Sequence, residues 1–329
     1  MIFRQLFDLT SSTYTYLIGC EKTKKALLID PVFELVRRDL ALIEELGLTL
    51  DVVCDTHCHA DHVTAAWLLK NKTGCKIACA QVTAATGVDI PLKDGDEIRV
   101  GSEMLNVLAT PGHTDGCLSF VMADYSRAFT GDALLIRGCG RCDFQQGSAA
   151  TLYHSVQDKL FCLPDECEIY PGHDYHGRTK TTVAEERAFN TRLGGDASEQ
   201  DFIGYMDAMQ LPHPRLIEHA VPANMKSGEP EEGELPVEVN WAPVHYSFSG
   251  IPEVDVEWVI SNRDKVHVLD VREASELENP VDRLDNSQVI ALPQLRESID
   301  EVPTDKPIVC LCRSGRRSAM AVSILQKAG

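Results

Sequence analysis

Apolar positions along this chain follow a strand-like spacing in some stretches and a helix-like spacing in others. The apolar run 25–32 ends at an Asp-Pro pair, which is typical of a strand stopped by a turn. Residues 34–46 carry apolar side chains at helical spacing, and Gly47 follows them as a stop signal. Residues 50–54 form the next apolar, β-branched run, a predicted buried strand, and 60–70 are predicted to be helical. The pattern predicts an α/β fold built from strand–loop–helix units.

Three later predicted strands each end in a loop that contains a possible metal ligand. These strands are expected at 104–109, 127–130 and 168–170. The loops after them contain His113, Asp132 and His173, respectively. Ligand sites of open α/β sheets collect at the carboxyl ends of the strands. We therefore expect these three side chains to meet at one edge of the fold, together with His57, which follows the strand 50–54.

The rest of the first half is predicted to be mainly helical. Helices are expected at 151–161 and 181–190, and another is expected after Ser198, which begins a serine-led capping pattern. Phe202 and Met206 then lie on one apolar stripe, which favours core packing over contact with a cofactor.

The chain is predicted to contain two domains. It has 329 residues, whereas single cores stop growing near about 250–300 residues. A stretch at 227–250, rich in acidic residues, Gly and Pro, is the expected linker between domains 1–226 and 251–329. In the second domain strands are predicted at 266–270, 288–292 and 307–311, followed by a loop and a helix at 319–327.

The segment 55–62, Asp-Thr-His-Cys-His-Ala-Asp-His, carries the strongest chemical signal. It places His57, His59, Asp61 and His62 on a predicted strand-to-helix turn. Imidazole and carboxylate groups are the usual protein ligands of divalent transition metals. A buried charge without a partner is costly. Four ligand-type side chains at this spacing therefore predict a metal site.

Charge and composition exclude several classes of partner and suggest a compartment. The net charge of −19 argues against nucleic acid and anionic membranes as partners. No apolar run approaches the roughly 18 residues of a membrane-spanning helix, and the N-terminus lacks the layout of a secretory signal. Twelve cysteines without such a signal indicate a reducing compartment, so a cytoplasmic location is expected. The one CxxC pair, at 139–142, has no second pair, which makes a zinc ribbon a weak interpretation.

Taken together, these residues resemble a known pattern. His57-x-His59-x-Asp61-His62 with His113, Asp132 and His173 resembles the metallo-β-lactamase fold, a sandwich of two sheets between helices (αββα). Within that superfamily residues 1–226 are similar to the persulfide dioxygenases. The stretches that carry this similarity are 56–62, 130–141 with 143–145, 170–176 and 220–225. One departure is Cys142, where a threonine is expected.

The resemblance implies one non-haem Fe(II) ion bound by two histidines and one aspartate. The implied ligands are His57, His113 and Asp132. The residues implied to orient them through hydrogen bonds are His59, Asp61, His62 and His173. On residue type alone, these four could equally complete a second metal position, as in the dinuclear zinc hydrolases of the same fold.

The implied substrates are glutathione persulfide and O2, and the implied products are sulfite and glutathione. Glutathione carries two carboxylates, so basic and hydroxyl groups are expected to bind it. The candidates for this role are Arg141, Tyr175, Arg192 and Arg178. Sulfite or thiosulfate is a further expected partner, no nucleic acid or membrane partner is expected, and a homodimer is left open.

The second domain resembles the rhodanese sulfurtransferases. Its loop Cys312-Arg313-Ser314-Gly315-Arg316-Arg317 follows a predicted strand and precedes a predicted helix. Loop amides, a helix N-terminus and arginines favour a thiolate, so Cys312 is the predicted catalytic residue. Residues 269–273, Leu-Asp-Val-Arg-Glu, also match the rhodanese pattern. Residues 285–292 replace the usual Gly-His-Ile-Pro-Gly segment, and with Gly329 as its last residue the domain is expected to be short at its C-terminal end.

Three alternatives remain open at this stage. The first domain could be a dinuclear zinc thioesterase of the glyoxalase II kind that hydrolyses acyl-glutathione. The second domain could bind sulfur or a partner without catalysis. Cys310 and Arg316 also have the C-x5-R spacing of a cysteine phosphatase, but Cys310 is predicted to lie in the strand, and Arg317 follows where Ser or Thr is usual.

Overall fold

The structure, a computed structural model, describes residues 1–209, 211–212, 214–231, 241–278, 284 and 286–328. The chain divides into two units, Met1–Leu235 and Pro236–Gly329, and each is described by itself. Residues 232–240 of the expected linker lie outside the described residues. In the second domain, Asp285 and Gly329 also lie outside them. The domain boundaries proposed from the sequence therefore remain a prediction.

One six-stranded sheet is built from the first part of the chain. Its strands are β1 (Ile2–Phe7), β2 (Tyr14–Gly19), β3 (Lys25–Ile29), β4 (Thr49–Cys54), β5 (Lys76–Ala80) and β6 (Ile90–Leu92), in this spatial order. Strands β1 to β3 are antiparallel, whereas β3, β4, β5 and β6 run parallel. Strands β3 and β4 thus end at the same edge, where the loops that begin at Asp30 and Asp55 start.

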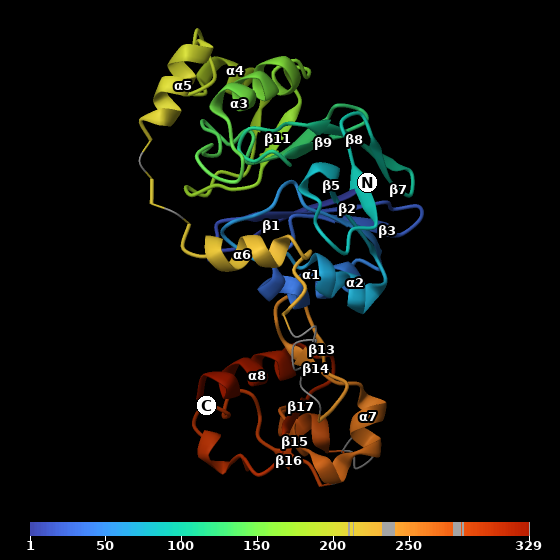
Figure 1. The fold of residues 1–329 in the computed structure, drawn as a ribbon. Helices are drawn as coiled ribbons and strands as arrows, with labels where there is room; N and C mark the ends of the chain where they lie inside the picture. Colours follow the sequence, from blue (N-terminus) through green and yellow to red (C-terminus); the bar gives the residue numbers. More distant parts are fainter. Residues whose placement is uncertain (210, 213, 232–240, 279–283, 285, 329) are drawn as a thin grey trace. The chain divides into compact units, whose positions relative to one another are not determined.

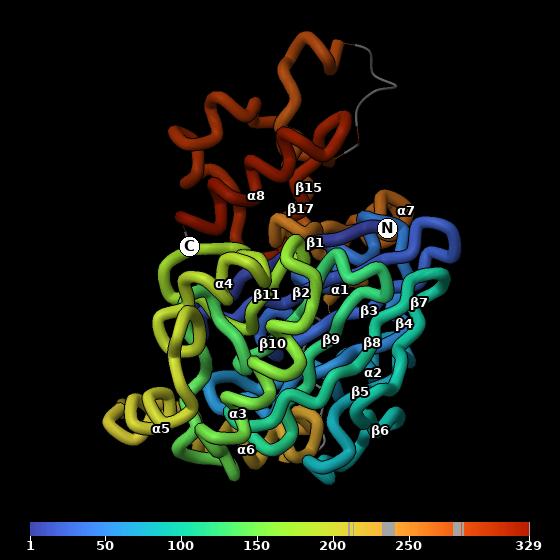
Figure 2. The backbone as a smooth tube through the Cα atoms, turned by 90° about the horizontal axis from the view of Figure 1, so that it is seen from above, coloured from blue at the N-terminus to red at the C-terminus, as the bar shows by residue number. Residues whose placement is uncertain are grey.

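The second six-stranded sheet collects the remaining strands of the first unit. They are β7 (Glu97–Val100), β8 (Glu103–Ala109), β9 (Leu118–Met122), β10 (Arg127–Gly131), β11 (Glu168–Pro171) and β12 (Thr181–Thr182), in the spatial order β12-β11-β10-β9-β8-β7. Figure 2 shows β7 to β11 side by side. Because β8 and β10 are both antiparallel to β9, and β11 is parallel to β10, β8, β10 and β11 end at one edge.

The two sheets pack face to face, with helices on both outer surfaces (Figure 1). The first sheet is covered by η1 (Phe33–Leu35), α1 (Val36–Glu45) and α2 (Ala66–Thr73), and the second by α3 (Ala149–Ser155), η3 (Val156–Leu160), α4 (Val183–Phe189) and α5 (Glu199–Asp207). The short η2 (Gln81–Thr83) and α6 (Ile217–Asn224) complete the unit. Tyr16, Phe120 and Phe129 fill the core between the sheets, and burying such a side chain contributes roughly 1.5–3 kcal/mol.

Some helix boundaries of the first unit differ from those predicted because of tertiary contacts. Residues 60–65 are not helical, and α2 begins at Ala66. The reason is tertiary: Asn224 Nδ2 donates to the carbonyls of His59 and His62, which a helix would need for its own bonds. Residues 181–182 pair with β11 before α4 starts. The capping box at Ser198 is confirmed, because its hydroxyl accepts from Asp201 N and the Asp201 carboxylate accepts from Ser198 N.

The second unit has a three-stranded parallel sheet in the order β16-β15-β17. Its elements are β13 (His245–Tyr246), β14 (Pro252–Glu253), α7 (Val256–Ser261), η4 (Arg263–Lys265), β15 (His267–Asp270), η5 (Ala274–Leu277), β16 (Gln288–Val289), η7 (Ile299–Glu301), β17 (Ile308–Leu311) and α8 (Arg316–Ala328). Strand β16 is shorter than predicted. Helix α8 starts three residues before the predicted 319, because the carbonyl of Gly315 already accepts from Ala319 N.

Candidate metal centre and sulfur-transfer loop

Three of the predicted ligands meet at the common edge of the two sheets. His57 follows β4, His113 follows β8 and Asp132 follows β10. One ligand atom from each lies within 4.8 Å of the others, and all three side chains are buried. Because each comes from a different loop, the packing of the two sheets brings them together.

Both ligand imidazoles are oriented by a hydrogen bond at Nδ1. Thr56 Oγ1 donates to Asp30 Oδ2 at 2.8 Å, so it accepts from His57 Nδ1, which lies 3.0 Å away. His113 Nδ1 donates to the carbonyl of Arg141 at 2.6 Å. In each ring the proton is therefore at Nδ1, and Nε2 is the nitrogen that can bind a metal.

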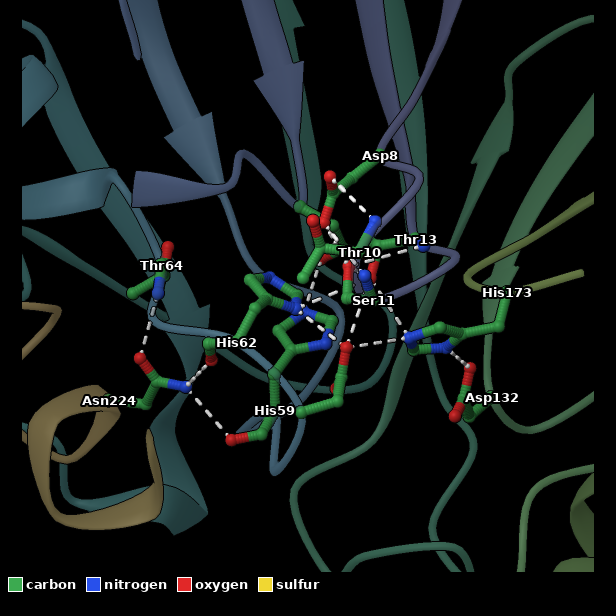
Figure 3. Close-up of polar contacts among 12 residues, drawn as sticks. Asp8, Thr10, Ser11, Thr13, His59, His62, Thr64, Asp132, His173 and Asn224 are labelled. Atoms are coloured by element: carbon green, nitrogen blue, oxygen red, sulfur yellow. Dashed lines mark hydrogen bonds and ion pairs between the residues drawn. The ribbon is translucent and has the colours of Figure 1, made fainter. Parts of the chain in front are cut away.

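Asp132 is oriented by His173, which lies between two carboxylates (Figure 3). His173 Nδ1 donates to Asp132 Oδ1 at 2.6 Å, and His173 Nε2 lies 3.0 Å from Asp61 Oδ2. Burial alone would lower the pKa of His173, but Asp132 and Asp61 raise it well above its ordinary value. Burial would likewise raise the pKa of Asp132, but His173, His113 and His57 lower it. Asp132 is therefore ionised and has its other oxygen, Oδ2, directed toward His113, with 3.7 Å to His113 Nε2.

A second set of ligand-type atoms lies beside the first. One atom each from His59, Asp61 and His62 also lies within 4.8 Å of the others. His62 Nδ1 donates to Asp61 Oδ2 at 2.9 Å. Among the described residues, His59 Nδ1 and His62 Nε2 have no hydrogen-bond partner. The structure thus brings all seven residues that the sequence singled out around one centre.

The first set fits a divalent transition metal. Burial and the neighbouring His59 lower the pKa of His57 well below its ordinary value, which favours the neutral imidazole that a metal requires. Glycines frame the ligands closely: a Cβ on Gly140 would lie 2.6 Å from His113 Nδ1, and one on Gly172 would lie 2.8 Å from Asp132 Oδ1. Two imidazoles and one carboxylate match the facial triad of non-haem iron sites.

Three residues that were not predicted from the sequence also shape this centre. Asp30 accepts from Thr56 N at 2.6 Å as well as from its hydroxyl, and Asn224 Oδ1 accepts from Thr64 N at 2.9 Å. Thr13 contacts several of the surrounding side chains. Asp30 follows a strand at the same edge and Asn224 lies in a stretch similar to the persulfide dioxygenases, so both had a signal; Thr13 had none.

The four side chains predicted to bind glutathione have different surroundings. Tyr175 is 68% exposed, and its ring lies parallel to that of His173 with 6.1 Å between centroids. Arg141 forms an ion pair with Asp143 and donates to two backbone carbonyls. Arg192 donates to the Cys139 carbonyl, and Arg178 forms an ion pair with buried Asp174. Of the four, Tyr175 is the most accessible.

Cys312 lies at the end of β17, in the turn before α8. Ser318 N donates to Cys312 Sγ at 3.4 Å, and the Ser318 hydroxyl lies at the same distance. Burial raises the pKa of Cys312, but the Ser318 hydroxyl and amide, with the amides of Ser314 and Arg317, outweigh it and lower the pKa to about 7. For Cys310, burial raises the pKa to about 12, which makes it a poor nucleophile.

The arginines of this loop are not equivalent. Arg317 forms a two-armed ion pair with Glu276, which follows β15, and its Nη2 lies 2.8 Å from Glu276 Oε1. Arg313 and Arg316 are exposed, and within the described part of the chain neither forms an ion pair. An open groove of about 1150 Å³, lined by the loop and by α8, adjoins Cys312. The loop therefore combines a thiolate with two accessible cations.

Comparisons with known proteins agree with this architecture. The sequence model of the Metallo-beta-lactamase superfamily matches residues 10–173, and that of the Rhodanese-like domain matches 255–329. "Persulfide dioxygenase ETHE1, mitochondrial" from Homo sapiens is 52% identical over 229 residues, which cover 69% of this chain and 89% of that protein. The crystal structure of ETHE1 from Myxococcus xanthus is 54% identical, with a TM-score of 0.67, and the match covers 69% of this chain and all of that one.

A solved metallo-beta-lactamase from Staphylococcus aureus is similar over both units. It covers 99% of this chain and 95% of its own, with a TM-score of 0.65 and 23% identity, so it supports the fold alone. The predicted αββα sandwich followed by a rhodanese-like α/β domain is confirmed by these matches. Within the described ranges, none of the helices has both the length and the apolar character needed to cross a membrane.

Proposed function

This chain belongs to the persulfide dioxygenase family of the metallo-β-lactamase superfamily and carries a rhodanese-like domain, and on that premise we propose that it oxidises glutathione persulfide with O2 and transfers sulfur through Cys312. The products of the oxidation would be sulfite and glutathione. The proposed location remains the cytoplasm, although the human relative is described as mitochondrial.

The observation that carries the oxidation is the arrangement of His57, His113 and Asp132. Their ligand atoms lie within 4.8 Å of one another, and each side chain is fixed by a separate hydrogen bond on the side away from the centre. An Fe(II) ion bound there would supply the one-electron and O2 chemistry that no side chain of this chain can perform. His57, His113 and Asp132 would hold the ion with three protein ligands only, the donor set of non-haem iron sites that react with O2.

The protein's own residues would bind and orient. Thr56, the Arg141 carbonyl and His173 hold the three ligands in position, so that substrate binding would not require them to reorganise. We propose that Tyr175, next to His173 and largely exposed, is the first contact of glutathione at the rim. Arg141 and Arg192 would add charge beside the loop that holds His113, and Arg178 would contribute while it remains bound to Asp174.

For the second unit, we propose exchange of sulfane sulfur on Cys312. The thiolate would attack the outer sulfur of glutathione persulfide, forming a cysteine persulfide as glutathione leaves as a thiol. Sulfite would then attack that outer sulfur, forming thiosulfate and restoring the Cys312 thiolate. Arg313 and Arg316 would attract the anions, and no outside oxidant is needed because the sulfur is transferred at the same oxidation level. The same steps can run in the opposite direction.

Metal analysis combined with O2 uptake tests the oxidation. We expect about one iron per chain and O2 consumption that depends on glutathione persulfide and produces sulfite. A protein that holds two zinc ions, with His173 bound to one of them, and that hydrolyses acyl-glutathione without using O2, would establish the thioesterase instead. The adjacent His59–Asp61–His62 set is the specific feature that keeps this rival worth testing.

A Cys312→Ser variant tests the second activity. We expect it to lose transfer of sulfur from glutathione persulfide to sulfite while O2 uptake is retained. Unchanged transfer would mean that the second unit is a binding module without this catalysis.

A further inference from the structure

A small cavity lies beside His57 in the first unit. Its volume is about 20 Å³, and since about 10–15 Å³ is enough for one water molecule, it has room for one molecule of the size of water or O2. Glutathione persulfide, a modified tripeptide, is far too large to enter it. The cavity is therefore a place for a small molecule and not for the organic substrate.

The lining of this cavity is mainly apolar. It includes the side chains of Ile77, Ala80 and Met225, together with two thiols, those of Cys58 and Cys79. Burial raises the pKa of Cys79 to about 11, so this thiol is uncharged at neutral pH. An uncharged thiol behaves as a small apolar group. Such a lining suits an uncharged, apolar molecule.

The polar side chains of the lining are already bonded to the protein. Thr83 Oγ1 and Ser227 Oγ each donate to a backbone carbonyl, at 2.8 Å and 2.6 Å. Asn224 forms three hydrogen bonds with the backbone of the loop at the first centre, and Asp55 Oδ1 accepts from Thr64 Oγ1 at 2.8 Å. Few polar groups remain for a water molecule, which needs about two to four partners, so the lining favours O2.

The cavity lies between the surface and His57, away from the rim at Tyr175. His57 is buried, whereas Met225 is 36% exposed. Figure 3 shows Asn224, which lines the cavity, and His173, whose ring lies against that of Tyr175, on opposite sides of the site. Among the described residues that line the cavity there is none of the four proposed to bind glutathione. The cavity and the glutathione rim therefore approach the centre from different sides.

We propose that this cavity admits O2 to the metal centre from the side of Cys79 while glutathione persulfide occupies the rim at Tyr175. This inference deepens the proposed function and rests on it. The two substrates would then have separate routes, so that neither has to leave before the other enters. The size of the cavity excludes the persulfide, and its apolar lining disfavours anions such as sulfite.

O2 itself is the probe for occupancy, because dissolved O2 is paramagnetic and speeds the relaxation of nearby methyl groups. The full chain is loaded with zinc in place of iron, since zinc has no redox chemistry, and methyl relaxation is measured by NMR with and without O2 pressure. Ile77 and Ile29 are both fully buried, but only Ile77 of the two lines the cavity. We expect the effect of O2 to be severalfold stronger at the Ile77 methyl groups. Equal effects at Ile77 and Ile29 would overturn the inference.

Cys79→Val tests the route, because it fills part of the cavity with a side chain that suits a strand. In the iron-loaded chain we expect a severalfold higher KM for O2, with unchanged kcat and unchanged KM for glutathione persulfide. The effect of O2 on Ile77 should fall to the level of Ile29. Cys75→Val is the matched control, because Cys75 lies near the same strand but outside the cavity, and it should keep the wild-type constants.

An unchanged KM for O2 in Cys79→Val, or equal rises in both KM values, would refute the route. If Cys79→Val does not fold, Ala85→Val, at another lining position, carries the same expectation, and the relaxation of Ile77 in the wild type needs no variant. O2 uptake by the iron-loaded wild type separates this inference from the proposed function. Uptake without an effect at Ile77 refutes the cavity alone, whereas no uptake refutes the dioxygenase and the route together.

Discussion

Replacing Ser318 with Ala tests whether the turn before α8 activates Cys312. Burial raises the pKa of this thiol, but the Ser318 hydroxyl and amide, together with the amides of Ser314 and Arg317, lower it to about 7, against an ordinary value of 9.0. At pH 7 about half of the thiol is then ionised, compared with about one part in a hundred at the ordinary value. Ser318→Ala removes the hydroxyl and keeps the amide, so we expect the pKa to rise by about one unit.

The alkylation rate at a single pH would report this change poorly. A rise of about one unit reduces the thiolate fraction at pH 7 about fivefold, but a more basic thiolate is about threefold more nucleophilic, which leaves a net fall of only about twofold. The midpoint of the rate against pH shows the full shift. The assay is therefore iodoacetamide modification from pH 5 to 10 of the peptide that contains Cys312, because the chain has twelve free cysteines.

Ser323→Ala is the matched control, because that hydroxyl lies on the same helix and bonds to the Ala319 carbonyl. We expect it to keep the wild-type midpoint near pH 7. A wild-type midpoint at 8.5 or above would refute the reasoning, since the turn would then not stabilise the thiolate. Identical midpoints in the wild type and Ser318→Ala would show that the backbone amides act without the hydroxyl.

Three further predictions concern the two centres. Asp132→Asn removes the anionic ligand, so we expect metal affinity to fall more than about 100-fold and O2 uptake to disappear, as measured by metal content and an oxygen electrode; retained iron would contradict the proposed ligand set. Asn224→Ala removes three buried hydrogen bonds to the loop of the first centre and should lower the free energy of unfolding in urea by about 2–4 kcal/mol, whereas the control Asn71→Ala, at an exposed amide, should change it by less than about 0.5 kcal/mol. Glu276→Gln weakens the partly exposed pair with Arg317, so stability should change little while sulfur transfer slows severalfold; transfer at the wild-type rate would show that this pair does not position the loop.

Several strands could be predicted because they depend on local pattern, whereas the layer order was expected only from the resemblance to the metallo-β-lactamase fold. Buried runs such as β4 and β10 read as strands, and the turns after them carry the polar side chains of the centre. The start of α2 could not be predicted, because it depends on Asn224, which lies more than 160 residues away in the chain and binds the carbonyls that would begin the helix. Local propensity favours a helix at 60–65, and a tertiary contact overrides it.

The same distinction applies to the candidate site. His57, His113 and Asp132 are recognisable because their side chains are metal ligands placed directly after strands. Thr13 lies in a polar loop and is not a typical metal ligand. Its contact with the site exists only because the β1–β2 loop meets His173, 160 positions away in the chain. Residue type reveals which side chains can bind a metal, whereas the hydrogen bonds that orient those side chains are visible only in the folded chain.

The two centres differ in how strongly their chemistry is coupled to folding. Around the metal centre Asp30, Thr56 and His173 are buried, and they compensate polar atoms that would otherwise be unpaired inside the protein. A substitution there changes ligand geometry and stability together, because a buried polar atom without a partner costs about 1–3 kcal/mol. The Cys312 turn is solvent-accessible and its donors are mostly backbone amides, so side-chain substitutions change the thiolate with little effect on the fold. Variants of the second unit can therefore change sulfur transfer with little change in stability. Variants of the first unit change oxidation and stability together.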